Sequence, residues 1–247
     1  MKTLANKVAL VTGSARGLGR AIAERYAALG ASVVLNYYRD QAAADEVLRT
    51  VQALGVPAIA VQADMSRVAD IERLFAEAQR AYGRLDIVVA NAGVELVDLP
   101  ATDFTEAQFD HLFSLNAKGT YFTLQQGARA VADNGRLLYV ASSTTAFPAP
   151  GMAVYGGSKT PGRYLIDVLA KELGPRGITA NSIIPYATAG AGIFTEGHSS
   201  VEYLIVANPM GRLATVADVA NVAEFFASDL ASFVSGQHLL VNGGANL

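Results

Sequence analysis

Tyr155 and Lys159 are the residues of this chain whose types and spacing most directly suggest proton-transfer chemistry. They stand four residues apart, so on a helix both side chains lie on one face. A phenol has an ordinary pKa of about 10, and a neighbouring ammonium group favours the phenolate and lowers that pKa. Ser142 follows an apolar run, where its hydroxyl could bind a substrate oxygen. The three residues could therefore serve general acid–base catalysis, although Tyr and Lys at this spacing also occur as structural residues.

A second motif, near the N-terminus, could bind phosphate. Residues 12–19 read Thr-Gly-Ser-Ala-Arg-Gly-Leu-Gly, after four apolar residues and before a stretch with apolar residues at helical spacing. Glycines permit backbone angles closed to other residues and let a ligand approach the main chain, while a helix N-terminus offers unpaired N–H groups. Such glycines alone are often an ordinary turn, but the strand and helix around them favour binding of a dinucleotide pyrophosphate.

The end of the second apolar run bears on which dinucleotide is bound. A site specific for NAD usually carries Asp or Glu about 20 residues beyond the glycines, to bind the ribose 2′-hydroxyl. This chain has Asn36-Tyr37-Tyr38-Arg39 instead. No carboxylate would repel a 2′-phosphate there, and Arg39 and Arg16 could both reach it, so the sequence favours NADP. The alternative is that both arginines are solvated residues at loop edges.

Polar and small residues also follow the third and fourth apolar runs. Asp64, before Met65, could lie beside an adenine ring, or it could belong to the N-cap region of the next helix. Asn91-Ala92-Gly93 would let the sheet edge approach a sugar, with the Asn side chain bridging neighbouring strands. Asn116 is a polar residue in an otherwise apolar helical stretch, so its amide needs partners. It could be a satisfied core residue, or it could break the helix locally and hold a water molecule.

These motifs are distributed along an alternating series of strands and helices. Apolar runs predict strands at Lys7–Val11, Ser32–Leu35, Ala58–Val61, Ile87–Ala90, Arg136–Val140, Thr179–Ile184 and Leu239–Val241. Helical spacing predicts helices at Arg16–Leu29, Gln41–Leu54, Val68–Tyr82, Thr105–Ala132, Val154–Leu173 and Val216–Ser228. The alternation indicates an α/β fold, a Rossmann-type doubly wound sheet of about seven parallel strands with helices on both faces. In such a sheet, ligands bind beyond the carboxyl ends of the strands, where the motifs above fall.

Composition limits the class of protein. The chain has 247 residues, 51% of them hydrophobic, and no linker divides it, so we predict one domain over residues 1–247. Cysteine is absent, and His111, His198 and His238 lack metal-ligand spacing, so no metal site is expected. A formal net charge of −3 with dispersed basic residues argues against nucleic-acid binding. Short apolar runs and the absence of a signal sequence predict a soluble, cytoplasmic protein without membrane spans.

Taken together, the motifs resemble those of the short-chain dehydrogenase/reductases of the short, single-domain type. The resemblance rests on Thr12–Gly19, Asn91–Gly93, Asn116, Ser142, Tyr155 and Lys159, and it extends to Ser235–Gly244. It therefore covers essentially the whole chain. Within the family, the chain is similar to 3-oxoacyl-carrier-protein reductases and related NADPH ketoreductases.

The resemblance implies a role for each of four catalytic residues. Tyr155 would be the general acid/base and Ser142 would polarise the carbonyl. Lys159 would hold the nicotinamide ribose and lower the pKa of Tyr155, while Asn116 would position a water in a proton relay to Lys159. The residues expected to bind NADP(H) are Gly13, Ser14, Arg16, Gly17, Leu18, Gly19, Tyr38, Arg39, Asp64, Met65, Asn91, Ala92, Gly93, Tyr155, Lys159, Ile184, Pro185 and Thr188.

Two positions depart from the family pattern. Pro161 removes a helix N–H just after the Tyr-Lys pair, so the helix is expected to tighten or kink there. Tyr186 follows Pro185 where Gly is usual, and it would crowd the nicotinamide, stack over the substrate, or be a plain surface tyrosine. Residues 186–208 are expected to form a substrate lid, and Val94-Glu95-Leu96 would line the same pocket.

These observations predict an NADP-dependent oxidoreductase that acts on CH–OH groups. It would use NADPH to reduce a ketone or 3-oxoacyl-type carbonyl to a secondary alcohol by hydride transfer. One alternative is NAD-dependent oxidation of a sugar or other secondary alcohol. A non-enzymatic alternative is a catalytically silent NADP-binding sensor or assembly subunit, against which the intact Ser-Tyr-Lys set weighs. The resemblance also implies a homotetramer that pairs the helices at Thr105–Ala132 and Val154–Leu173.

Overall fold

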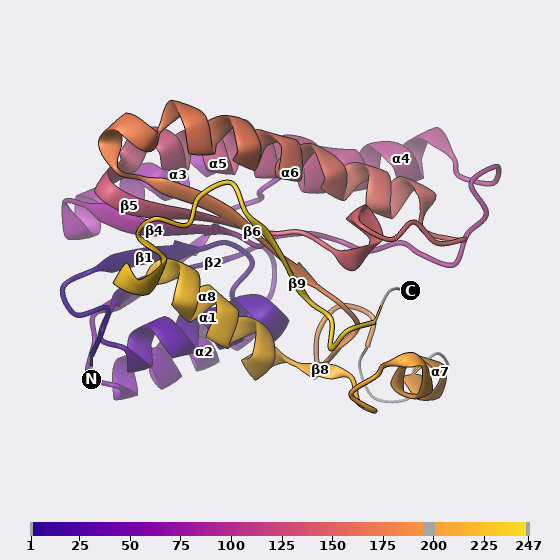
Figure 1. Ribbon diagram of the computed structural model, residues 1–247. Helices are drawn as coiled ribbons and strands as arrows, with labels where there is room; N and C mark the ends of the chain where they lie inside the picture. Colours follow the sequence, from indigo (N-terminus) through magenta and orange to yellow (C-terminus); the bar gives the residue numbers. More distant parts are fainter. Residues whose placement is uncertain (1, 195–200, 246–247) are drawn as a thin grey trace.

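The computed structural model describes residues 2–194 and 201–245, and its central feature is a parallel sheet. The seven strands lie in the order β3-β2-β1-β4-β5-β6-β9 (Figure 1). They are β1 (Val8–Val11), β2 (Ser32–Tyr37), β3 (Ala58–Gln62), β4 (Leu85–Ala90), β5 (Val131–Val140), β6 (Thr179–Pro185) and β9 (His238–Val241). All the pairs are parallel. The predicted α/β doubly wound fold is therefore confirmed, and its strand order reverses between β1 and β4, where such sheets bind ligands.

Helices cover both faces of the sheet, each over its own apolar core (Figure 1). One face carries α1 (Gly17–Ala28), α2 (Gln41–Ala53) and α8 (Val216–Ala227), and the other carries α3 (Val68–Tyr82), α5 (Thr120–Ala130) and α6 (Ala153–Glu172). Ile22 and Val219 bury their side chains in the first core, and Leu124 and Ile166 in the second. Within residues 2–194 and 201–245, no helix has both the length and the apolarity needed to cross a membrane.

A buried hydrogen bond joins the first helix of the chain to the last long one. The Tyr26 hydroxyl, on α1, donates to the carbonyl of Ala223, on α8, over 2.9 Å. Tyr26 is fully buried, so this bond is made in an apolar environment. Phe226 and Val219 of α8 lie in the same core as Ile22 of α1. The two helices therefore form one packed layer.

The stretch predicted as a single helix over residues 105–132 is three helical segments followed by a strand. Thr105 caps α4 (Glu106–Leu112) in a capping box with Gln108. A π-helix, η1 (Phe113–Gly119), follows and leads into α5. The predicted end at residue 132 is wrong by two residues, because Val131 is buried and pairs with Leu85 of β4 as the first residue of β5.

The chain between β6 and α8 contains only short elements in its described part. They are β7 (Thr188–Ala189), α7 (Val201–Ala207) and β8 (Ala214–Thr215), with β7 and β8 paired in parallel. The predicted lid over residues 186–208 includes residues 195–200, which lie outside the described residues.

Helix α6 carries Tyr155 and Lys159 against the sheet. It is not interrupted at Pro161, whose side chain is exposed. The next residue, Gly162, is buried, and a Cβ there would lie 2.5 Å from the ring of Tyr139 on β5. No larger residue fits without displacing one element, so Gly162 sets how closely α6 approaches β5. The depth of Tyr155 and Lys159 in the fold depends on that approach.

We expect Gly162→Ala to lower the free energy of unfolding by about 1–3 kcal/mol, because the added methyl overlaps the Tyr139 ring. Gly157→Ala on the same helix is the control. A Cβ at Gly157 would meet only the Phe113 ring, at 3.9 Å, so the variant should keep or slightly increase stability. Urea denaturation measures both variants, and equal effects would contradict the packing argument.

Candidate active site

Three of the four residues predicted to be catalytic lie around the carboxyl end of β5. Ser142 follows the strand, and its Oγ accepts hydrogen bonds from the Thr144 hydroxyl at 2.9 Å and the Thr144 N–H at 3.3 Å. Tyr155 and Lys159 reach the same end of the sheet from the first turns of α6, and both are buried. The Lys159 ammonium donates to the carbonyl of Val140, the last residue of β5, at 3.1 Å. The predicted sharing of one helix face by Tyr155 and Lys159 is thus present in the fold.

Asn116 lies in the π-helix η1, and its amide is fully paired. Its Oδ1 accepts from the Val94 N–H at 2.9 Å, and its Nδ2 donates to the Val94 carbonyl at 2.9 Å and the Ser158 hydroxyl at 3.0 Å. Of the two alternatives left open by the sequence, the satisfied core residue describes this side chain, and the surrounding helix is locally widened as well. The side chain joins the loop after β4 to α6. Its role in a proton relay stays a prediction.

Gly93 brings the backbone at the end of β4 close to this cluster. A Cβ on Gly93 would lie 2.9 Å from the Lys159 ammonium nitrogen and 3.1 Å from Asn116 Oδ1. Any larger residue would therefore push against Lys159. Three elements consequently meet at one place: the loop after β4, the π-helix and α6. The sequence had predicted their residues only as separate motifs.

The glycine-rich turn is held by side chains from the neighbouring strand end. Asn91 Nδ2 donates to the carbonyls of Thr12 at 2.9 Å and Gly13 at 3.2 Å, which is the predicted bridge between strands. The Thr12 hydroxyl accepts from the N–H groups of Asn91 and Ala92, both at 3.0 Å. Gly13 has a φ of +62°, and a Cβ on it would lie 2.9 Å from Ala92 Cα. Only glycine suits this position, where the turn and the loop after β4 touch.

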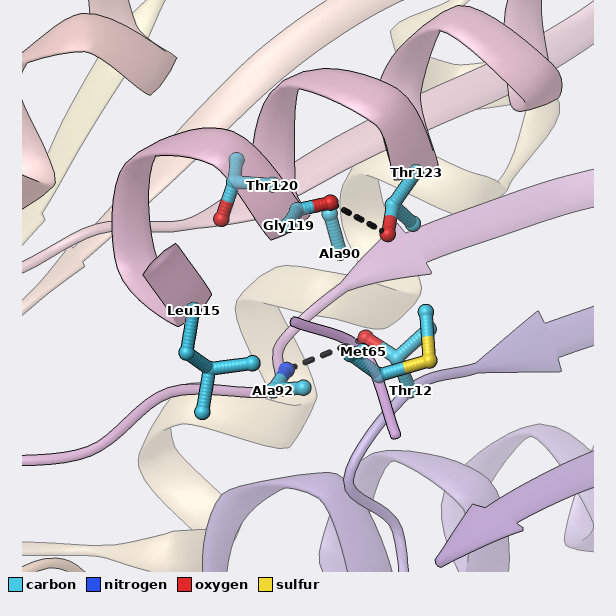
Figure 2. A pocket seen from close by; sticks show the side chains of 8 residues that line it. All are labelled: Thr12, Met65, Ala90, Ala92, Leu115, Gly119, Thr120 and Thr123. Carbon is cyan, nitrogen blue, oxygen red and sulfur yellow. Dashed lines mark hydrogen bonds between the residues drawn. The ribbon is translucent and has the colours of Figure 1, made fainter. Parts of the chain in front are cut away.

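Figure 2 shows the packing behind this turn. Thr12 and Ala92 face Thr123 and Gly119 of the helical layer across a gap with no room for a water molecule. A Cβ on Gly119 would overlap the carbonyl of Met65, so the π-helix touches the chain after β3 directly. The turn and the helical layer are therefore densely packed against each other at this place.

The turn and α1 fit a pyrophosphate group on two grounds. The N-terminus of α1, at Arg16 and Gly17, has no side-chain cap and no acidic residue in its first turn, so neither a cap nor a carboxylate keeps an anion from its first N–H donors. Gly19 lies so close to Gly13 that a Cβ there would overlap the Gly13 carbonyl and lie 2.5 Å from Asn91 Nδ2. Ser14 is buried, and its hydroxyl bonds to the Asn36 backbone. Leu18 is partly buried against the first core.

Residues 36–39, at and just after the end of β2, include no carboxylate that could bind a ribose hydroxyl. Asn36 is buried; its Oδ1 accepts from the Gly13 N–H at 2.9 Å, and its Nδ2 donates to the Ala63 carbonyl at 3.1 Å. Asp40 is engaged as the N-cap of α2, accepting from the Ala43 N–H at 2.9 Å. The stretch where an NAD site usually has its acid thus contains none, and the amide of Asn36 in that stretch supports the glycine-rich turn.

Both arginines predicted to meet a 2′-phosphate are exposed. The Arg39 guanidinium lies 4.6 Å from the centroid of the Tyr38 ring and donates to the Tyr38 hydroxyl at 3.1 Å. The Arg16 side chain has no hydrogen-bond or ion-pair partner within the part of the chain that the structure describes. The two side chains come from the glycine-rich turn and the end of β2, which are joined through Asn36. The exposure of Arg16 and Arg39 agrees with both alternatives from the sequence, a phosphate site and solvated loop residues.

Asp64 and Met65 follow β3. The Asp64 carboxylate accepts from the Ser66 N–H at 2.9 Å and the Ser66 hydroxyl at 2.7 Å. Helix α3 begins later, with Arg67 as its N-cap residue, so Asp64 stabilises the turn before the helix and does not cap the helix itself. Met65 is buried against η1.

The residues after β6 form a small core of their own. Ile184 and Pro185 complete β6, and the Thr188 hydroxyl donates to the Tyr186 carbonyl at 2.7 Å. Tyr186 is buried with Ala187, Leu213 and Ala245, so its prediction as a plain surface tyrosine is wrong. Its ring fills the space under the α7 segment, because Val201, Leu204 and Ile205 pack against the same cluster.

Glu95, which the sequence placed only in the pocket lining, touches the predicted acid/base directly. The Tyr155 hydroxyl donates to Glu95 Oε1 at 3.1 Å. Burial raises the pKa of Tyr155 well above its usual range, the Glu95 carboxylate raises that pKa further, and the Ser142 hydroxyl lowers it. This is opposite to the lowering expected from the resemblance. The sequence signal was the lone carboxylate two residues after Asn91-Ala92-Gly93.

Burial has the opposite effect on the neighbouring cation. It lowers the pKa of Lys159 to about 8, against the opposing attraction of Glu95. Desolvation therefore favours the neutral form of both Tyr155 and Lys159.

Comparison with known proteins gives consistent matches along almost the whole chain. The family model described as enoyl-(acyl carrier protein) reductase matches residues 13–246. The short chain dehydrogenase/reductase AacuN of Aspergillus aculeatus is 38% identical, and the match covers 98% of this chain and 96% of AacuN.

Two solved structures are similar in sequence and fold. A short-chain dehydrogenase of Burkholderia cenocepacia J2315 in complex with NADP has a TM-score of 0.93 and 32% identity, over 99% of this chain and 100% of that one. The angucycline C-6 ketoreductase LanV with bound NADP has a TM-score of 0.92 and 33% identity, over 98% of this chain and 96% of that one.

The pKa of Lys159 predicts how stability depends on pH. Between its folded value of about 8 and its usual value of 10.5, the unfolded chain binds more protons, so this group makes the free energy of unfolding rise with pH. The slope approaches about 1.4 kcal/mol per pH unit. Lys159→Met lacks this contribution, so its stability relative to the wild type should be greatest below pH 8 and should decline above it.

Urea denaturation at a series of pH values measures this difference. Lys171→Met, an exposed lysine on the same helix, is the control and should show no such trend. A pH-independent difference between Lys159→Met and the wild type would contradict the burial argument.

Proposed function

Because this chain belongs to the short-chain dehydrogenase/reductase family, we propose that it is an NADPH-dependent reductase that converts a ketone or 3-oxoacyl-type carbonyl into a secondary alcohol. The observation that carries this proposal is the convergence of Ser142, Tyr155 and Lys159 at the carboxyl end of β5, beside Gly93. A buried phenol, a hydroxyl and an ammonium group gathered at that edge suit the protonation of a developing alkoxide. The structurally similar LanV is named a ketoreductase, which supports the same class of reaction for this chain.

In this proposal, the bound nicotinamide supplies the hydride that the carbonyl carbon receives. Tyr155 gives its hydroxyl proton to the carbonyl oxygen, because the raised pKa keeps the phenol neutral and able to donate. Ser142 donates a second hydrogen bond to the same oxygen and orients it. Lys159 holds its place through Val140 and would bind the ribose hydroxyls. Asn116 keeps the loop after β4 against α6, and the relay role predicted for it belongs to this proposal.

We assign the remaining predicted cofactor residues by the part of NADP(H) they could contact. The uncapped N-terminus of α1, with the glycine-rich turn, would hold the pyrophosphate. Arg16 and Arg39 would bind the 2′-phosphate, because residues 36–39 at the end of β2 supply an arginine and no carboxylate. Asp64 and Met65 would face the adenine. Ile184, Pro185 and Thr188 would border the nicotinamide.

The alternatives make different demands on the same residues. An NAD-dependent alcohol dehydrogenase would need a hydrogen-bond acceptor for the ribose hydroxyls at the end of β2, where Asn36 is already paired. A silent NADP-binding subunit would not need the buried Tyr155 and Lys159. Both alternatives predict cofactor binding, so turnover and cofactor preference distinguish them.

We further propose that the protein is a cytoplasmic homotetramer and that residues 186–208 act as the substrate lid. The helices predicted to pair carry exposed aromatic side chains: Phe109 on α4, Tyr121 on α5 and Tyr164 on α6, the last 74% exposed. Exposed aromatics on adjoining helices are typical of subunit interfaces.

We expect Tyr155→Phe to bind NADPH as tightly as the wild type and to lose ketone reduction by about 10²–10⁴-fold, because it lacks the donated proton. Steady-state absorbance of NADPH measures turnover, and NADPH fluorescence measures binding. Tyr82→Phe, on α3 and away from the cluster, is the control. Full activity of Tyr155→Phe would eliminate the proposed mechanism.

We expect Arg39→Ala to raise the KM for NADPH about tenfold, corresponding to ~1.4 kcal/mol, and to leave the KM for NADH unchanged. Both constants are measured side by side with one ketone. Arg49→Ala removes the same charge from the exposed side of α2 and should alter neither constant. A wild-type preference for NADH would reject the assignment to NADP.

A further inference from the structure

Glu95 links the predicted acid/base to the segment that follows β6. Its Oε1 accepts from the Tyr155 hydroxyl at 3.1 Å, and its Oε2 accepts from the Ile193 N–H at 2.9 Å. The two oxygens of one carboxylate thus bind groups that lie on α6 and on the predicted lid. Glu95 itself belongs to the loop after β4, so three separate parts of the chain meet at this side chain.

The chain is shaped to admit this carboxylate. Gly192, next to Ile193, has a φ of +58°, and a Cβ on it would overlap Glu95 Oε2 and lie 2.8 Å from Oε1. Glu95 is exposed to solvent. An exposed carboxylate beside a buried phenol stands at the boundary between solvent and the reacting groups.

A wholly structural role would require only the contact with Ile193. The second contact is the informative one, because Tyr155 must release Glu95 Oε1 before its proton can go to a substrate oxygen. Once released, Oε1 is an acceptor without its former donor, about a hydrogen-bond length from the Tyr155 hydroxyl. A substrate that supplies a replacement donor restores the lost bond.

We propose that Glu95 selects the substrate: it favours carbonyl compounds that carry a hydrogen-bond donor, such as a hydroxyl group, within two or three bonds of the carbonyl carbon, and it rejects those that carry a carboxylate there. This inference rests on the proposed reductase function and narrows its substrate class. A hydroxyl near the carbonyl would bind Glu95 Oε1 in place of Tyr155, while a carboxylate would meet a like charge at close range.

Three cyclic ketones of one skeleton test the inference: cyclohexanone, 2-hydroxycyclohexanone and 3-oxocyclohexanecarboxylate. For the wild type, kcat/KM should be highest for the hydroxy ketone and lowest for the carboxylate. Glu95→Gln keeps the shape of the side chain and removes its charge. We expect it to reduce the ratio of hydroxy ketone to carboxylate at least tenfold. An unchanged ratio would overturn the inference.

Asp98→Asn is the matched control. Asp98 lies on the same loop and carries the same charge, and none of its contacts reaches Tyr155 or Lys159. The variant should retain the wild-type order of the three ketones. If Asp98→Asn and Glu95→Gln change the ratio equally, the effect comes from net charge and the assignment to Glu95 is wrong.

Binding measured without turnover separates this inference from the proposed function. Ligand-observed NMR of the three ketones with the NADP⁺-loaded protein should show the same order of affinities, lost in Glu95→Gln. Binding in this order without reduction of any ketone by NADPH would reject the reductase and support the selection by Glu95. Equal affinities, or binding of none of the three, would overturn the selection.

A pH profile distinguishes the contact with Tyr155 from simple support of the loop. Glu95 and Tyr139 raise the pKa of Tyr155 and Ser142 lowers it, so removing the Glu95 charge must lower that pKa. Oxidation of cyclohexanol with NADP⁺ uses Tyr155 as the base, so the rise of its rate with pH should move to lower pH in Glu95→Gln. An unchanged profile would show that the carboxylate does not act on Tyr155.

Discussion

The hydrogen bonds of Thr12 and Asn91 hold together the ends of β1 and β4, and the geometry of both the glycine-rich turn and the loop after β4 depends on them. These two strands flank the point at which the strand order reverses. Beyond these strands the connections leave in opposite directions, so the two side chains extend the pairing of β1 and β4 past the last residues of the sheet. The side chains of Thr12 and Asn91 join the two strand ends. The backbone of Gly13 then lies against Ala92, and that of Gly93 against Lys159 and Asn116.

The parallel sheet and the long helices on its faces could be predicted from the sequence, because each has its own period of apolar residues, whereas β5 begins at Val131 and not at the predicted Arg136. The boundary at Val131 could not be predicted, since the change from α5 to β5 occurs without Gly or Pro, and pairing with Leu85 determines it. A local break of the helix at Asn116 was one of two alternatives from the sequence, which could not decide between them, because Gly119 and Asn116 contact Met65, Val94 and Ser158 from distant parts of the chain.

The candidate site shows a similar division. The spacing of Tyr155 and Lys159 was enough to place them on one helix face. The residue types at positions 36–39 were enough to show that no acid stands at the end of β2. The contact of Glu95 with Tyr155 spans sixty residues, and the direction of the Tyr155 pKa results from burial that only the packed α6 produces. Tyr186 was ambiguous for the same reason, because its environment consists of residues from four other parts of the chain. Local pattern identifies which side chains are available, and tertiary packing determines their ionisation.

The bond between Tyr26 and Ala223, with the packing of α1 against α8, has a consequence for biosynthesis. During synthesis α1 leaves the ribosome early, yet the helix that covers part of its apolar face is made nearly two hundred residues later. Until then the part of α1 that α8 covers, at Tyr26, is uncovered on a growing chain that already contains most of the sheet. The nascent protein therefore carries this uncovered apolar surface until late in translation, and completion of α8 covers it.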